Sequence, residues 1–241
     1  ISNPQVVWIP ENFSFETIRI ALAYLNYWEA LKNSVTLAAV STVIQVVSSA
    51  VVGYSFAKLR FKGSDIIFYL VLFTLVVPNE TLDMSRYLFF LNTPFFGIRL
   101  IYNSFSIFIM SAFGMGVRSA IRTFWNVMLP NARGAIVTVS LFAFVWQYND
   151  YYFAHLFRYE RQMPLLTTNL AAGSGNLSAV LVTSFGDLLR DLGEEIKDDP
   201  LFFGLITNTA ALLMMLPLLI SYFFVQKLFV ESIERTGITG M

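Results

Sequence analysis

The run NSVTLAAVSTVIQVVSSAVVGYSF, from Asn33 to Phe56, is an almost uninterrupted apolar stretch without a charged side chain. A helix needs about 20 apolar residues to cross the hydrocarbon core of a bilayer, so this run is long enough to form a membrane span. Lys58, Arg60 and Lys62 follow it directly. The stretch therefore predicts a transmembrane helix with a basic flank.

The composition of the whole chain indicates the same class of protein. Hydrophobic residues make up 56% of the 241 residues and charged residues only 13%, whereas a soluble domain is about one quarter charged. The net charge is zero, so no overall field attracts nucleic acid or an acidic substrate. The absence of cysteine excludes disulfides, thiol nucleophiles and thiolate metal sites, and His155 is the single histidine. The chain is predicted to be an all-α integral membrane protein, a polytopic helix bundle.

Four further apolar stretches predict membrane spans. They run from about Ile66 toward Asp83, from about Leu100 to Met115, from Gly134 to about Phe153, and from Leu201 to about Val230. The first of these reaches spanning length only if its helix continues past Pro78, which predicts a kink at that proline. Five spans are thus visible in the sequence.

The first span contains five polar residues, Ser41, Thr42, Gln45, Ser48 and Ser49, which can serve either helix packing or contact with a ligand. Small and polar side chains commonly hold transmembrane helices together, so helix packing is favoured here over contact with a ligand.

The basic residues predict the orientation of the spans. Basic side chains gather in the loop after the first span, in the loop between the third and fourth spans, and in the tail. Because loops rich in Lys and Arg stay in the cytoplasm, these three segments are predicted to be cytoplasmic. Residues 1–32 then form an extracytoplasmic segment, 33–230 the transmembrane domain, 155–200 an outer loop and 231–241 a cytoplasmic tail. An outside start predicts a further span before Ile1, giving six in the intact protein.

The outer loop contains a second helical pattern. Leu188, Leu189, Leu192 and Ile196 recur at helical spacing beside several acidic and basic residues. This pattern predicts an amphipathic helix outside the membrane.

Residues 114–130, GMGVRSAIRTFWNVMLP, predict a short surface helix on the cytoplasmic side. Apolar residues recur every three or four positions on one face, arginines occupy the other, and Pro130 is expected to end the helix. A helix of this kind can lie in the membrane interface as a connector or fill a groove in a partner protein. The pattern alone leaves both alternatives open.

A polar and aromatic cluster is predicted at the end of the fourth span. Its members are Trp146, Gln147, Tyr148, Asn149, Asp150, Tyr151 and Tyr152. Sugars are bound by aromatic faces together with carboxylates and amides, so the cluster can line a substrate path. The alternative is an interfacial belt of Trp and Tyr with Asp150 in outer water.

Five short motifs are distributed over nearly the whole chain: WIPE (8–11), YSFAKLRFKG (54–63), FWNVMLP (124–130), WQYND (146–150) and QKLFVE (226–231). Together, and in this order, they resemble the carbohydrate-uptake ABC importer permeases, and the second membrane subunit of maltose-type importers in particular.

The resemblance implies a permease subunit that pairs with a second homologous permease and imports a sugar or oligosaccharide. It also implies two ATP-binding subunits that bind ATP and magnesium, an extracytoplasmic sugar-binding protein, and a bacterial or archaeal cytoplasmic membrane. This chain itself would need no cofactor, and it contains no ATP-binding motif, so it is predicted not to be an enzyme.

The resemblance assigns roles to two groups of residues. The coupling helix 116–130 would contact the ATPase through Gly116, Val117, Arg118, Ile121, Arg122, Phe124, Trp125, Met128, Leu129 and Pro130. The substrate path would be lined by Trp146, Gln147, Tyr148, Asn149, Asp150 and Tyr151. The Glu-Ala-Ala triplet and the Asp of the family's coupling loop are missing here, so further residues are expected between Met115 and Arg118 in the intact protein.

Two other functions remain as alternatives. A secondary transporter or channel subunit would need buried charges within its spans, and almost none are found. A membrane scaffold without transport activity is the second alternative.

Overall fold

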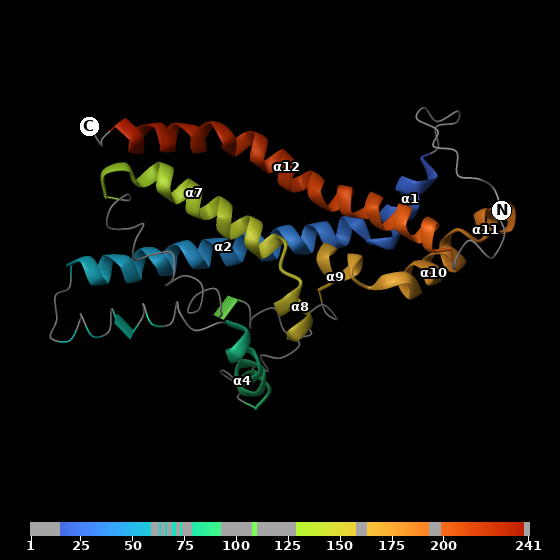
Figure 1. Ribbon diagram of the computed structural model, residues 1–241, viewed down its shortest axis with the longest axis horizontal. Coiled ribbons are helices and arrows are strands. Elements are labelled where there is room, and N and C mark those ends of the chain that lie inside the picture. Colours follow the sequence, from blue (N-terminus) through green and yellow to red (C-terminus); the bar gives the residue numbers. More distant parts are fainter. Residues whose placement is uncertain are drawn as a thin grey trace.

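The computed structural model describes residues 15–58, 63, 66, 69–70, 73, 79–92, 108–109, 129–157, 163–192 and 199–238. All regular structure within these residues is helical, which confirms the all-α class (Figure 1). The labelled helices are α1 (Glu16–Tyr24), α2 (Tyr27–Lys58), α4 (Asn79–Asn92), α7 (Leu129–Tyr148), α8 (Tyr152–Leu156), α9 (Leu166–Leu170), α10 (Gly173–Ser184), α11 (Gly186–Leu192) and α12 (Pro200–Ile238).

Three long helices, α2, α7 and α12, form the body of the described structure (Figure 1). Helix α7 packs against both α2 and α12. Two of the three contain segments long and apolar enough to cross a membrane, Tyr27–Ser49 in α2 and Pro200–Lys227 in α12. These segments coincide with the first and the fifth predicted spans. The predicted second and third spans lie largely outside the described residues.

The boundaries predicted for the fourth span are wrong. Helix α7 runs from Leu129 to Tyr148, whereas the sequence predicted a span from Gly134 to about Phe153. Pro130 lies in the first turn of α7, and the predicted helix before it lies outside the described residues. A proline is tolerated there because the first N–H groups of a helix have no partner within the helix.

Two interhelical hydrogen bonds lie beside a proline inside α12, and the proline explains one of them. Pro217 has no N–H, so the carbonyl of Leu213, four residues earlier, loses its normal partner in the helix. The Tyr27 hydroxyl donates to that carbonyl at 3.2 Å. The Tyr148 hydroxyl donates to the neighbouring Met214 carbonyl at 3.0 Å. Side chains from α2 and α7 thus hold α12 next to its proline, and α12 bends along its length in Figure 1.

Helices α9 and α10, helix α1 and most of α4 lie in segments for which the sequence predicted no helix. Helix α1 belongs to the predicted N-terminal segment, yet it buries Ile20, Ala21 and Tyr24 and packs against α12. Burial raises the pKa of Tyr24, which keeps its hydroxyl protonated, and that hydroxyl donates to the Leu170 carbonyl at 2.8 Å. Helix α4 lies in the predicted loop between the second and third spans. Neither α1 nor α4 contains an apolar run long enough to cross a membrane, so the search for membrane spans in the sequence did not find them.

The amphipathic helix predicted in the outer loop corresponds to α11. Leu189 is buried, Leu188 is partly buried against the core, and Asp187 and Arg190 are exposed. The prediction therefore holds for this helix, while Ile196 lies outside the described residues.

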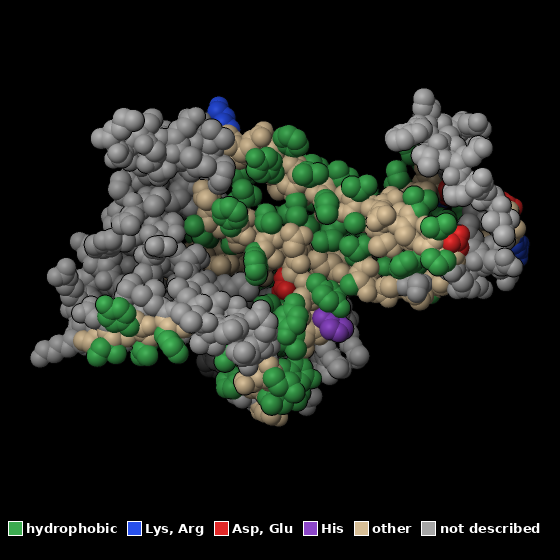
Figure 2. Space-filling view, viewed as in Figure 1, with side chains coloured by type: hydrophobic (Ala, Val, Ile, Leu, Met, Phe, Trp, Pro, Cys, Tyr) green, Lys and Arg blue, Asp and Glu red, His purple; other side chains and the backbone are tan. Residues whose placement is uncertain are grey.

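The described surface is apolar along the long helices. Figure 2 shows hydrophobic side chains spread over α12 and α7. The exposed apolar residues of α12 include Leu201, Leu212, Phe223 and Phe224, each more than 60% exposed. A surface of this kind is typical of a protein whose helices face lipid.

Candidate functional site

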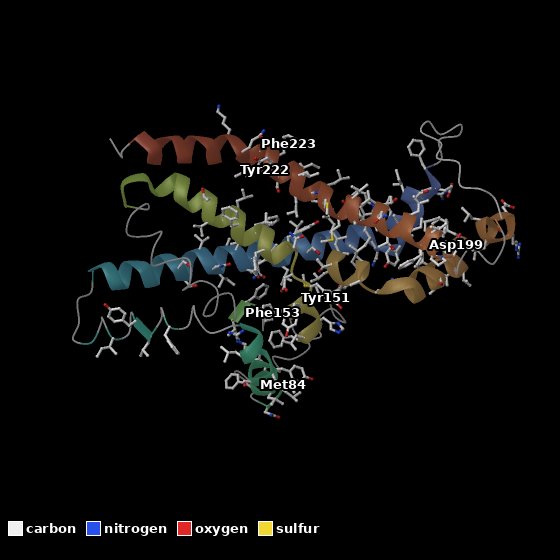
Figure 3. The ribbon with its side chains drawn as sticks, in the orientation of Figure 1. Met84, Tyr151, Phe153, Asp199, Tyr222 and Phe223 are labelled. Atoms are coloured by element: carbon white, nitrogen blue, oxygen red, sulfur yellow. The ribbon has the colours of Figure 1, made fainter. Side chains whose placement is uncertain are left out.

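The centre of the candidate site is the connector between α7 and α8. The chain leaves α7 after Tyr148, passes through Asn149, Asp150 and Tyr151, and starts the short helix α8. Asp150 Oδ1 accepts a hydrogen bond of 3.1 Å from the Phe153 N–H, which fixes the carboxylate at the first turn of α8. Figure 3 shows Tyr151 and Phe153 where this connector meets α8.

The second carboxylate oxygen of Asp150 is buried and has no hydrogen-bond partner among the described residues. A buried carboxylate oxygen without a donor is energetically costly. In a membrane protein such a group is a candidate for contact with a transported solute or ion. The local geometry therefore makes Asp150 the strongest candidate of the predicted cluster.

Polar side chains hold the connector in place. The Thr167 hydroxyl donates to the Asp150 carbonyl at 3.2 Å, and the Leu166 N–H donates to Ser34 Oγ at 3.0 Å. The Asn33 amide donates to the Pro164 carbonyl at 3.0 Å. The segment after α8 is thus attached both to Asp150 and to the first turns of α2.

Aromatic packing supports α8 from the other side. Phe157 is completely buried, with ring centroids 5.1 Å from Phe90 of α4 and 6.1 Å from Phe153. Leu37 of α2 and Leu165 belong to the same apolar cluster. The position of Asp150 therefore depends on contacts among α2, α4 and α8.

The structure does not bring all the predicted path residues together. Trp146 is 65% exposed and Tyr151 is 41% exposed, whereas Gln147 and Tyr148 are buried. Because residues 146–148 are consecutive in a helix, they point in different directions. The Tyr148 hydroxyl is bonded to α12 and therefore has a structural role.

Asn149 and Tyr151 make local contacts. The Asn149 amide donates to the Val145 carbonyl at 3.0 Å, and the Tyr151 ring stacks on His155 at a centroid distance of 5.5 Å. Within the described residues, no group of three or more His, Asp and Glu side chains is placed to bind a metal ion.

The predicted coupling residues lie outside the described residues, except that Leu129 and Pro130 begin α7. Their contact with an ATPase therefore stays a prediction from the sequence and the family resemblance.

Comparison with known proteins shows similarity along most of the chain. A probable ABC transporter permease of Pyrococcus horikoshii is 23% identical, with 85% of this chain and 73% of the relative covered. A probable starch degradation products transport system permease of Thermoanaerobacterium thermosulfurigenes is 21% identical, with 93% and 81% covered. The melibiose/raffinose/stachyose import permease of Bacillus subtilis is 19% identical, with 97% and 84% covered. No family model matches the chain.

These relatives confirm the resemblance to carbohydrate-uptake ABC importer permeases. They support a permease component of an ABC importer as the function, and therefore a membrane-embedded transport subunit that acts in a complex rather than an enzyme. The low identity combined with wide coverage agrees with motifs distributed from residue 8 to residue 231.

Proposed function

We propose that this chain is one of two non-identical permease subunits of an ABC importer for a neutral oligosaccharide. The intact subunit spans the cytoplasmic membrane of a bacterium or archaeon with six helices. Two ATP-binding subunits supply ATP and magnesium from the cytoplasmic side, and a sugar-binding protein delivers the substrate from outside. The observation that carries this proposal is the similarity, over 93% or more of the chain, to the permeases named for starch degradation products and for melibiose, raffinose and stachyose.

The distribution of charge supports ATP-driven import over ion-coupled transport. The sequence has no charged residue between Asn33 and Ala57, or between Pro200 and Gln226. Ion-coupled transporters carry conserved ionisable groups inside their spans to bind the coupling ion. The apolar stretches from Asn33 to Ala57 in α2 and from Pro200 to Gln226 in α12 contain no such group, which favours a source of energy outside this subunit.

A reconstituted complex tests the proposed function. The subunit is purified together with its native partners, and ATP hydrolysis is measured in liposomes with raffinose, stachyose and maltodextrins in the presence of the binding protein. An ATPase pair and a second permease should copurify, and one class of oligosaccharide should stimulate hydrolysis several-fold. Amino acids serve as control solutes. Purification without an ATPase, or hydrolysis that no sugar changes, would contradict the proposal.

We expect Asp150→Asn to reduce the efficiency of sugar uptake by about 10- to 150-fold, the usual range for a lost hydrogen bond to a charged group. Asparagine keeps an oxygen for the Phe153 N–H, so α8 and the assembly of the complex should be retained. Uptake of labelled sugar by proteoliposomes measures the effect.

The matched control is Asp187→Asn, because Asp187 is a fully exposed carboxylate on α11. An exposed carboxylate contributes less than about 0.5 kcal/mol, so this variant should transport normally. If Asp150→Asn also transports normally, Asp150 belongs to an interfacial belt and does not face the path.

A further inference from the structure

From Ser41 to Ser49, helix α2 has the reverse of the polarity that a helix in a soluble protein shows. Five polar side chains of α2 are buried, Ser34, Ser41, Thr42, Gln45 and Ser49, each 8% exposed or less, whereas Thr36 is exposed. Its valines on the opposite side are open, with Val43 62% and Val47 57% exposed. A helix in lipid places valine outward, and polar groups turn toward other helices or toward a water-filled path.

The hydrogen bonds separate these two possibilities. Polar groups that hold helices together are bonded, as Ser34 is to the Leu166 N–H. In contrast, Ser41 Oγ, Thr42 Oγ1 and Gln45 Oε1 are buried without a hydrogen-bond partner among the described residues. Several hydroxyls inside helices donate to a carbonyl four residues back, as Ser48 of α2 does to Ile44 and Thr209 of α12 does to Leu205, whereas Thr207 of α12 is unpartnered. Ser41 and Thr42 lack even this bond.

A second, independent group continues the same polar face. Asp150 is attached to the outer end of the face, because Thr167 bonds its carbonyl and the adjacent Leu166 bonds Ser34. Its unpartnered Oδ2 lies beyond the end of α7, on a different segment of the chain. From Ser34 to Ser49 the face extends about 22 Å along the helix axis, most of the roughly 30 Å hydrocarbon core.

We infer that the unpartnered polar groups of α2, those of Ser41, Thr42 and Gln45, form the wall that this subunit contributes to the translocation path. This inference rests on the proposed function. The wall is buried in the structure described here, and it becomes solvated when the path opens. Its hydroxyl and amide groups then bind the hydroxyls of an uncharged oligosaccharide. Residues 34–49 include no charged side chain, so the groups of α2 itself suit an uncharged solute.

The natural absence of cysteine allows a direct test of exposure to water. Single variants Ser41→Cys and Gln45→Cys, with Val43→Cys as the lipid-facing control, are prepared in the complete complex in liposomes. Each is treated with a charged methanethiosulfonate reagent with and without ATP turnover, and labelling of this subunit is measured. We expect the two polar-face cysteines to react at least about tenfold faster than Val43→Cys during turnover, because the reagent enters water and not lipid.

Sugar binding is tested on the same wall with Gln45→Leu. This variant removes an unpartnered polar group, so assembly and the thermal unfolding midpoint should not fall. The sugar concentration for half-maximal uptake should rise about 3- to 10-fold, the effect of losing one or two neutral hydrogen bonds. A role in helix packing predicts the opposite result, a loss of stability with unchanged uptake.

The experiments distinguish failure of this inference from failure of the proposed function. Normal sugar-stimulated hydrolysis by the native complex, combined with Ser41→Cys and Gln45→Cys labelling no faster than Val43→Cys, overturns the path wall alone. Labelling of both cysteines in a complex whose hydrolysis no sugar stimulates overturns oligosaccharide import as the function of this wall.

Discussion

Replacing Phe124 or Trp125 with alanine should weaken capture of the partner ATPase by about 30- to 700-fold, because truncating a buried aromatic anchor costs on the order of 2 to 4 kcal/mol. The two rings are adjacent in the predicted coupling helix, beside Arg118 and Arg122. A pull-down of the ATPase with purified permease variants measures the loss directly.

The arginine variants provide the matched control. Arg118→Ala and Arg122→Ala should have smaller effects that decrease further as the salt concentration rises, since charges at the rim of an interface are screened. If the segment is only a membrane connector, Trp125→Ala changes lipid association and leaves ATPase recovery intact. Full recovery with both aromatic variants, together with normal transport-coupled hydrolysis, would rule out coupling through this helix.

Phe157→Ala should destabilise the subunit by about 3 to 5 kcal/mol, the usual cost of deleting a fully buried aromatic ring. Phe157 contacts rings from both α4 and α8, so its removal leaves a cavity beneath the Asp150 connector. The thermal unfolding midpoint of the purified complex should fall by at least about 6 °C. Sugar uptake should fall with it, because the cavity loosens the position of Asp150.

Phe142→Ala is the matched control for this prediction. Phe142 lies on α7 and is 64% exposed, so its truncation removes little buried apolar surface. Its unfolding midpoint should stay within about 2 °C of the native value, since exposed substitutions change stability by about 0.5 kcal/mol or less. Equal destabilisation by both variants would show that Phe157 does not pack as described.

The sequence by itself determined the class of protein. Spans are set by the length of apolar runs, a local property, and the runs at Asn33–Phe56 and Leu201–Val230 correspond to the candidate spans of α2 and α12. The helical spacing of Leu188 and Leu189 likewise predicted α11. The family resemblance came from short motifs in a fixed order, and the relatives confirm it.

Only the tertiary structure decided which polar residues share an environment. The sequence grouped Trp146 with Asp150 because they are neighbours in the chain, but the end of α7 at Tyr148 leaves Trp146 on an exposed face and Asp150 in a partly buried connector. From the sequence we predicted that the polar residues of α2 hold helices together. Serine, threonine and glutamine occur both in helix packing and along a solvated path, so residue type does not distinguish the two roles. Hydrogen bonding separates the roles, and it depends on partners such as Leu166 and Thr167 that lie more than 100 residues away from Ser34. Local patterns contain no information about such distant partners, which is the physical reason why the sequence predicts the spans but not which polar side chains of α2 are hydrogen-bonded.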